Sequence, residues 1–137
     1  MWPMSYFAIP YRARGRDRTG CDCWGLVRLV YREQLGVDLK SFAEIAPTDV
    51  KGVTAAIAAE QPAWSRHPFD GRREFDVVIM RARLAINGVA VAPEMHIGIV
   101  TPDLNILHTE QPQGVACVTA DHPTMVRRVA GVYRSCH

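Results

Sequence analysis

The sequence lacks any apolar run approaching the ~18 residues that a membrane-spanning helix needs, so we expect no membrane insertion. Its first six residues include no basic residue, and Pro3 and Pro10 interrupt the start, so we expect cytoplasmic synthesis without a signal peptide. Glycine-rich phosphate loops and dinucleotide fingerprints are also missing. The net charge of +2 is too small to indicate a nucleic-acid partner.

What is present is ordinary globular composition. The chain has 137 residues, of which 48% are hydrophobic and 22% are charged, and this length predicts a single domain over 1–137. Four cysteines are present, and without an export signal we expect free thiols. Cys21 and Cys23 are too close in sequence for an unstrained disulfide.

The first part of the chain predicts helices. Apolar residues at 3–4 spacing predict a helix over 23–35, with Asp22 as its N-cap and Gly36 following its end. An alanine-rich stretch over 48–60 predicts a second, minor helix. The prolines and glycine of 62–71 indicate a surface loop.

From residue 75 the apolar period changes to two. This predicts strands over 75–80, 96–100, 104–109, 115–118 and 129–133, and Asn87-Gly88 predicts the tip of a hairpin within 81–93. One main helix followed by an antiparallel sheet is an α+β domain with segregated layers.

Cys23 is the first candidate for chemistry. At the start of a helix its sulfur lies near unpaired backbone N–H groups and the positive end of the dipole, which favours the nucleophilic thiolate. The arginines of 12–18 act in the same direction. The alternative is an inert, buried cysteine.

A nucleophilic cysteine needs a base and a residue that orients it. If the turn after Val100 is a three-residue loop over 101–103, His96 lies directly opposite His108 on one face of the sheet. Gly98 would then leave open surface where the helix could approach. A two-residue turn would put the histidines on opposite faces. The alternative for each is an ordinary polar residue on a half-exposed sheet.

A zinc site is the competing interpretation. Cys21, Cys23, His96 and His108 are possible ligands, but the Cys-x-Cys spacing is unusual for zinc and no second paired motif follows. We therefore expect no metal and no cofactor.

Several segments together resemble the NlpC-type cell-wall cysteine peptidases, which have a papain-like fold. The nucleophile motif of that family resembles 20–27 (Gly-Cys-Asp-Cys-Trp-Gly-Leu-Val), its first core strand resembles 75–78 (Phe-Asp-Val-Val), and its base-bearing strand resembles 96–99 (His-Ile-Gly-Ile). The strand with the third polar residue resembles 104–108. The resemblance implies a nucleophile-bearing helix packed on an antiparallel sheet.

The resemblance also implies roles. Cys23 would attack the amide of a peptidoglycan stem peptide, commonly between D-glutamate and the diamino acid; His96 would be the base and His108 its orienting partner. Tyr11 matches a tyrosine near the nucleophile, and with Asp22 it would position the oxyanion or substrate. We expect two further residues to bind substrate: Arg16, in the arginine-rich stretch, and Trp24, which replaces a usual small residue.

The sequences of residues 22–28 and 131–134 resemble those of phage-tail members of the family. This implies a tail-associated protein that acts in the periplasm after delivery, with phage tail proteins as partners. Two alternatives remain open: a tail assembly or structural protein that retains the fold, and an antibacterial amidase effector.

Overall fold

The computed structural model describes residues 1–41, 63–81, 84–86, 89–91 and 94–136, together with positions 52, 55, 56 and 59. Its helical elements are η1 (Trp2–Tyr6), α1 (Cys23–Val30), η2 (Tyr31–Leu35), η4 (Phe69–Gly71) and α3 (Pro123–Arg128). Its strands are β1 (Arg16–Asp17), β2 (Gly20–Cys21), β3 (Trp64–His67), β4 (Val77–Arg81), β5 (Leu84–Ile86), β6 (Val89–Val91), β7 (Glu94–Val100), β8 (Ile106–Glu110), β9 (Gly114–Val118) and β10 (Val129–Ser135).

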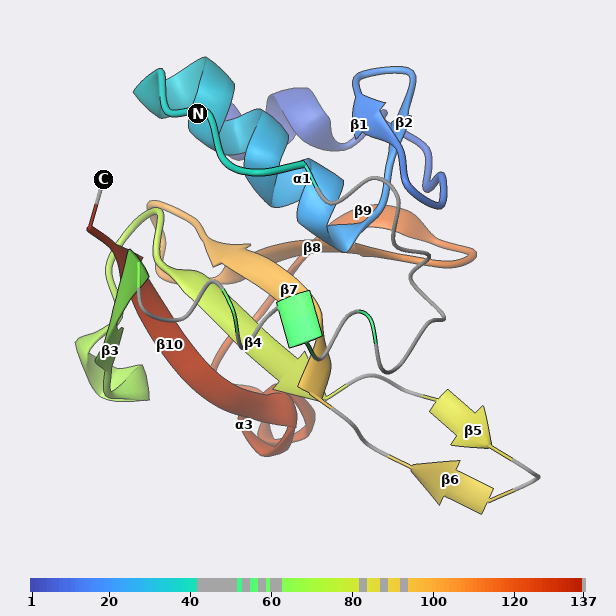
Figure 1. The fold of residues 1–137 in the computed structure, drawn as a ribbon. Coiled ribbons are helices and arrows are strands. Elements are labelled where there is room, and N and C mark those ends of the chain that lie inside the picture. Colours follow the sequence, from blue (N-terminus) through green and yellow to red (C-terminus); the bar gives the residue numbers. More distant parts are fainter. Residues whose placement is uncertain are drawn as a thin grey trace.

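Six strands form the main sheet in the order β3-β10-β4-β7-β8-β9, and every neighbouring pair is antiparallel. Helix α1 packs against β7 and β8. In Figure 1 it lies above the sheet, whereas α3 lies below the sheet. The α+β architecture with a helix packed on an antiparallel sheet is therefore confirmed. No helix among the described residues has the length and apolar character needed to cross a membrane.

Two hydrophobic cores lie within the described part of the chain. The larger joins α1 to the sheet through residues such as Leu26, Ile97 and Leu107. The smaller joins Met125 of α3 to strand residues such as Val78 and Ile106. The side chains of successive strand residues alternate between the two sides, which is why Ile97 and Ile106 belong to different cores.

The helical segment over 23–35 is confirmed, as α1 followed without interruption by η2, which has a wider π-helical turn. Asp22 caps its start and Gly36 ends it in the left-handed conformation, with φ of 66°. Only glycine adopts that conformation without steric cost. The pair β5–β6 confirms the predicted hairpin, although Asn87 and Gly88 themselves lie outside the described residues.

The register of the β7–β8 hairpin corrects our prediction. Ile99 pairs with Leu107 and Val100 with Ile106, and Thr101 N–H donates to Asn105 O over 2.9 Å. The loop therefore has three residues, as expected, but it spans 102–104 instead of 101–103. Leu104 takes the left-handed conformation that such loops require, with φ of 63°.

Other segments differ from expectation. Part of the predicted surface loop over 62–71 is β3, which pairs with β10. Helix α3 was not predicted. The positions described within 48–60, namely 52, 55, 56 and 59, are helical. Strand β4 begins at Val77 instead of residue 75, because Phe75 has a φ of 72°, which interrupts the extended chain.

Candidate active site

The start of α1 is fixed by Asp22. One of its carboxylate oxygens accepts hydrogen bonds from Gly25 N–H over 2.8 Å and from Arg16 Nη1 over 2.7 Å, and the other accepts from Arg14 N–H over 3.0 Å. Asp22 is only 3% exposed. Its carboxylate thus holds the preceding loop against the first turn of the helix and positions the next residue, Cys23.

Arg16 and Gly25 complete this junction. Besides Asp22, the Arg16 guanidinium binds Ser41 O over 2.6 Å and Gly15 O over 2.8 Å. A Cβ on Gly25 would lie 2.1 Å from Gly15 O, so only glycine allows the loop to approach the helix. Arg16 therefore binds to groups of the protein itself, and its contact with substrate stays a prediction.

The Cys23 thiol lies against β7. The backbone N–H groups of Ile97 and Trp24 both donate to its sulfur, and each lowers its pKa. Burial, followed by the Asp22 carboxylate, has the larger opposing effect and raises the pKa to about 12. The helix-start N–H thus favours the thiolate, as expected, but desolvation outweighs it, so the thiol needs a base to lose its proton.

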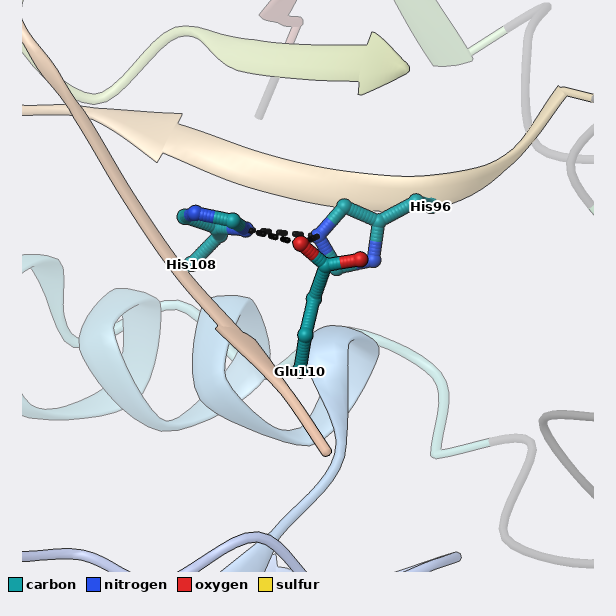
Figure 2. Close-up of side chains that lie close together, drawn as sticks. All are labelled: His96, His108 and Glu110. Atoms are coloured by element: carbon teal, nitrogen blue, oxygen red, sulfur yellow. Dashed lines mark hydrogen bonds and ion pairs between the residues drawn. The ribbon is translucent and has the colours of Figure 1, made fainter. Parts of the chain in front are cut away.

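His96 and His108 are the residues that we predict as that base and its partner. His96 Nε2 lies 2.7 Å from His108 Nδ1, with the rings nearly perpendicular at 74° (Figure 2). Both side chains are buried. Burial lowers the pKa of His96 to about 3, so at neutral pH it is uncharged and can accept a proton. The expected contact between the histidines is thus confirmed.

The reason for the contact differs from our prediction. Moving the loop by one residue shifts the register by two, which keeps both histidines on one face because the side-chain period is two. They are therefore diagonal neighbours instead of directly opposed residues, and the long imidazoles span the gap. The open surface expected at Gly98 is also absent: a Cβ there would meet Ile106 at 2.6 Å and Met80 at 3.0 Å.

The corrected register reveals a residue that sequence reasoning missed. Continued along the strands, it places Glu110 opposite His96. Glu110 Oε1 lies 3.5 Å from His108 Nδ1 and 3.9 Å from His96 Nε2 (Figure 2). Two hydrogen bonds of 3.1 Å tie its carboxylate to Arg128 at the end of α3. Only the exact position of the loop could have indicated Glu110.

The same three residues are the one group of possible metal ligands among the described residues. Two imidazole nitrogens at ~2.0–2.1 Å from a tetrahedral zinc would be roughly 3.3 Å apart, whereas those of His96 and His108 are 2.7 Å apart. The Glu110 carboxylate is already ion-paired with Arg128. This geometry fits a hydrogen bond better than a metal. Cys21, a candidate zinc ligand in the sequence, is a fully buried member of the larger core.

Tyr11 and Trp24 flank the start of α1. Tyr11 lies beside β2, and burial raises its pKa to about 12, with smaller contributions from the nearby Cys23, Asp22 and Glu110. Its hydroxyl is thus a neutral donor within electrostatic range of Cys23 and Glu110. The Trp24 indole donates to Lys40 O over 2.7 Å and its ring packs on the core. Its predicted contact with substrate is untested.

Sequence and structure comparisons identify the family. The model of the NlpC/P60 family matches residues 8–134, so the chain belongs to this family of cell-wall peptidases and amidases. The match includes Cys23, His96 and His108. A comparison with curated proteins gives no match.

Solved structures support the fold. The chain is similar to the NlpC/p60 domain of the peptidoglycan hydrolase SagA, with 19% identity, a TM-score of 0.61, and coverage of 97% of this chain and 92% of that one. It is also similar to a lipoprotein-like NLP/P60 family protein of Staphylococcus aureus (18% identity, TM-score 0.62, 98% of this chain and 39% of that one). A third match is an NlpC/P60 family protein of Bacillus cereus (15% identity, TM-score 0.64, 98% and 38%). The chain thus spans well under half the length of the latter two.

Proposed function

We propose that this protein is a cysteine peptidase that hydrolyses amide bonds in peptidoglycan stem peptides. The observation that carries the proposal is the position of the Cys23 sulfur. It accepts a hydrogen bond from the N–H of Ile97, the residue next to His96, while His96 is hydrogen bonded to His108. These contacts support the order of nucleophile, base and orienting residue that acyl transfer needs.

In this mechanism His96 Nδ1 removes the proton from the Cys23 thiol as the sulfur attacks the carbonyl carbon. The S–H bond breaks, an N–H bond forms and the carbonyl oxygen gains the negative charge. His96 then gives the proton to the leaving amine, and water hydrolyses the thioester. His96 Nε2–H donates to His108 Nδ1, which fixes the tautomer that leaves Nδ1 as the base.

Two donors are suited to stabilise the oxyanion. The backbone N–H of Cys23 is the first of α1, and the first N–H groups of a helix have no partner within it. The Tyr11 hydroxyl, protonated at neutral pH, is the second. Such donors in a water-excluding site typically contribute ~10²–10³-fold to turnover each. Asp22 acts indirectly, because its carboxylate holds the helix start.

The test is digestion of purified peptidoglycan, with released amino groups counted and the muropeptides analysed by mass spectrometry. Wild type should produce new amino termini, at the D-glutamyl–diamino acid bond in our proposal, and Cys23→Ala should produce none while retaining its circular dichroism spectrum. Cys117→Ala, which removes an exposed cysteine on β9, is the matched control. Full activity of folded Cys23→Ala would refute the mechanism.

We further propose that the protein is delivered to the periplasm as a component of a phage tail or a phage-derived particle. This rests on the resemblance of residues 22–28 and 131–134 to phage-tail members of the family. Mass spectrometry of purified particles from a producing strain tests it. Particles that lack the protein would favour an effector delivered by another route.

A further inference from the structure

Glu110 lies where a charge would act on the His96–His108 pair. Its Oε1 atom is 3.5 Å from one nitrogen of their shared hydrogen bond and 3.9 Å from the other. Direct hydrogen bonds to either nitrogen are therefore weak or absent, and the carboxylate acts mainly through its charge. The side chain is mostly buried, at 27% exposure, so water screens that charge only in part.

Arg128 fixes this carboxylate. Its two terminal nitrogens each donate to one oxygen of Glu110 over 3.1 Å, and its Nε donates to Arg81 O over 2.9 Å. The Arg128 side chain is 9% exposed. A bidentate pair leaves the carboxylate one orientation, and in this orientation Oε1 faces the histidines (Figure 2).

We propose, resting on the function proposed above, that Glu110 is a positioning residue that stabilises the His96 imidazolium formed when Cys23 gives up its proton. In the resting site both the thiol and the imidazole are neutral. Proton transfer creates a thiolate and an imidazolium, and the positive charge then appears beside the Glu110 carboxylate. Arg128 holds that carboxylate in place and keeps it ionised.

The other charged groups near the pair also affect how readily His96 becomes protonated. Glu110 raises the pKa of His96, whereas its neighbours His108 and Arg128 lower it by smaller amounts. Beyond the pair, the start of α1 carries Cys23 and Asp22, and the N-terminal arm carries Tyr11, which lies within electrostatic range of Cys23, Asp22 and Glu110 and is neutral at pH 7. Among these, Glu110 and Asp22 are the negative charges, and each is ion-paired with an arginine, Glu110 with Arg128 and Asp22 with Arg16. Glu110 is the carboxylate that raises the pKa of His96.

The experiment measures the alkylation rate of Cys23 by iodoacetamide between pH 5 and 10, because this rate follows the thiolate fraction and requires no peptidoglycan. For Glu110→Gln we expect the profile to move about one pH unit upward, which is a tenfold slower rate at pH 7. Glu110→Asp keeps the charge and should stay closer to wild type. Cys117 and Cys136, both exposed, are internal standards whose rates should not change.

Two further variants separate a positioning role from a structural one. Glu110→Gln leaves the Arg128 guanidinium buried without its partner, which destabilises the fold. The double variant Glu110→Gln/Arg128→Gln removes both charges and should therefore be more stable than the single variant. Its profile should still move upward, because Glu110 acts more strongly on His96 than Arg128 does. Glu33→Gln removes a carboxylate that is paired with Arg18 near the far end of the helical segment and should leave the profile unchanged.

A wild-type alkylation profile in folded Glu110→Gln and in the double variant would overturn the inference, and so would an equal shift in Glu33→Gln. Loss of the fold in both Glu110→Gln and the double variant would show that the fold requires this carboxylate, and would also overturn the inference. His96→Gln separates this inference from the proposed function. A Cys23 rate that does not depend on His96 refutes the catalytic proposal, whereas one that depends on His96 but not on Glu110 refutes only this inference.

Discussion

His96 Nε2 and His108 Nδ1 lie 2.7 Å apart, so one proton is shared between two buried rings. Since a hydrogen bond has one donor, the tautomer of one ring sets the tautomer of the other. His96 can act as a base through Nδ1 only when Nε2 holds the shared proton. In the mechanism that we propose, the ability of His96 to act as a base therefore depends on His108.

The two histidines should differ in their effect on turnover. We expect His96→Ala to lower kcat by about 10²–10⁴-fold, the usual contribution of a general base. His108→Ala should cost less, because the base remains and only its orientation is lost. The measurement is kcat on peptidoglycan fragments, with His67→Ala on β3 as the control. Equal and negligible losses in both variants would contradict the assignment.

Acid should destabilise the domain through His96. The unfolded chain protonates this histidine near pH 6.5, whereas burial lowers the folded-state pKa to about 3. The unfolded state therefore binds more protons between these values, and stability present above pH 6.5 is lost as the pH falls toward 3. Glu110, whose pKa is also lowered, adds to the loss at the acid end of this range.

The loss can be at most about 1.4 kcal/mol per pH unit for one proton. Urea denaturation at pH 7, 6, 5 and 4 measures it. His96→Gln should flatten the dependence on pH, while His67→Gln should retain the wild-type slope. An unchanged slope in His96→Gln would contradict the prediction.

The ion pair between buried Asp76 and partly buried Arg134 should be a main contributor to stability. Asp76 is 1% exposed and accepts two hydrogen bonds of 2.8 Å from the Arg134 guanidinium and one from Arg73 N–H. Arg134→Met leaves this carboxylate buried without its cation, which typically costs ~3–5 kcal/mol. Thermal or urea denaturation provides the measurement.

The matched control for that pair is Asp121→Ala. Asp121 pairs with Arg72 at 3.3 Å, but its side chain is 76% exposed. Exposed pairs contribute about 0–1 kcal/mol, so this variant should be nearly neutral. Similar losses for the two variants would show that burial does not distinguish the pairs.

Gly25→Ala should reduce activity more than its effect on stability explains. A Cβ at this position would lie 2.1 Å from Gly15 O, so the loop must move away from the helix start that holds Cys23. Gly36→Ala is the control, because its cost arises from the positive φ at the far end of the helical segment and should be ~1–2 kcal/mol. kcat per folded molecule should fall for Gly25→Ala and remain at the wild-type value for Gly36→Ala.

The sequence by itself determined the local structure. Asp22 before an apolar 3–4 pattern fixes the start of a helix, and a period of two fixes the strands, because caps and side-chain periodicity act over a few residues. The class of the domain and the residues Cys23, His96 and His108 follow from these signals and from the family resemblance.

Only the tertiary structure decided the register of β7 and β8 and the protonation of the site. The left-handed conformation of Leu104 sets the loop at 102–104, and this places Glu110 beside the histidines, where Arg128 from a distant helix meets it. Burial likewise outweighs the helix terminus in raising the pKa of Cys23. Both outcomes depend on long-range packing and desolvation, which a local sequence pattern does not specify.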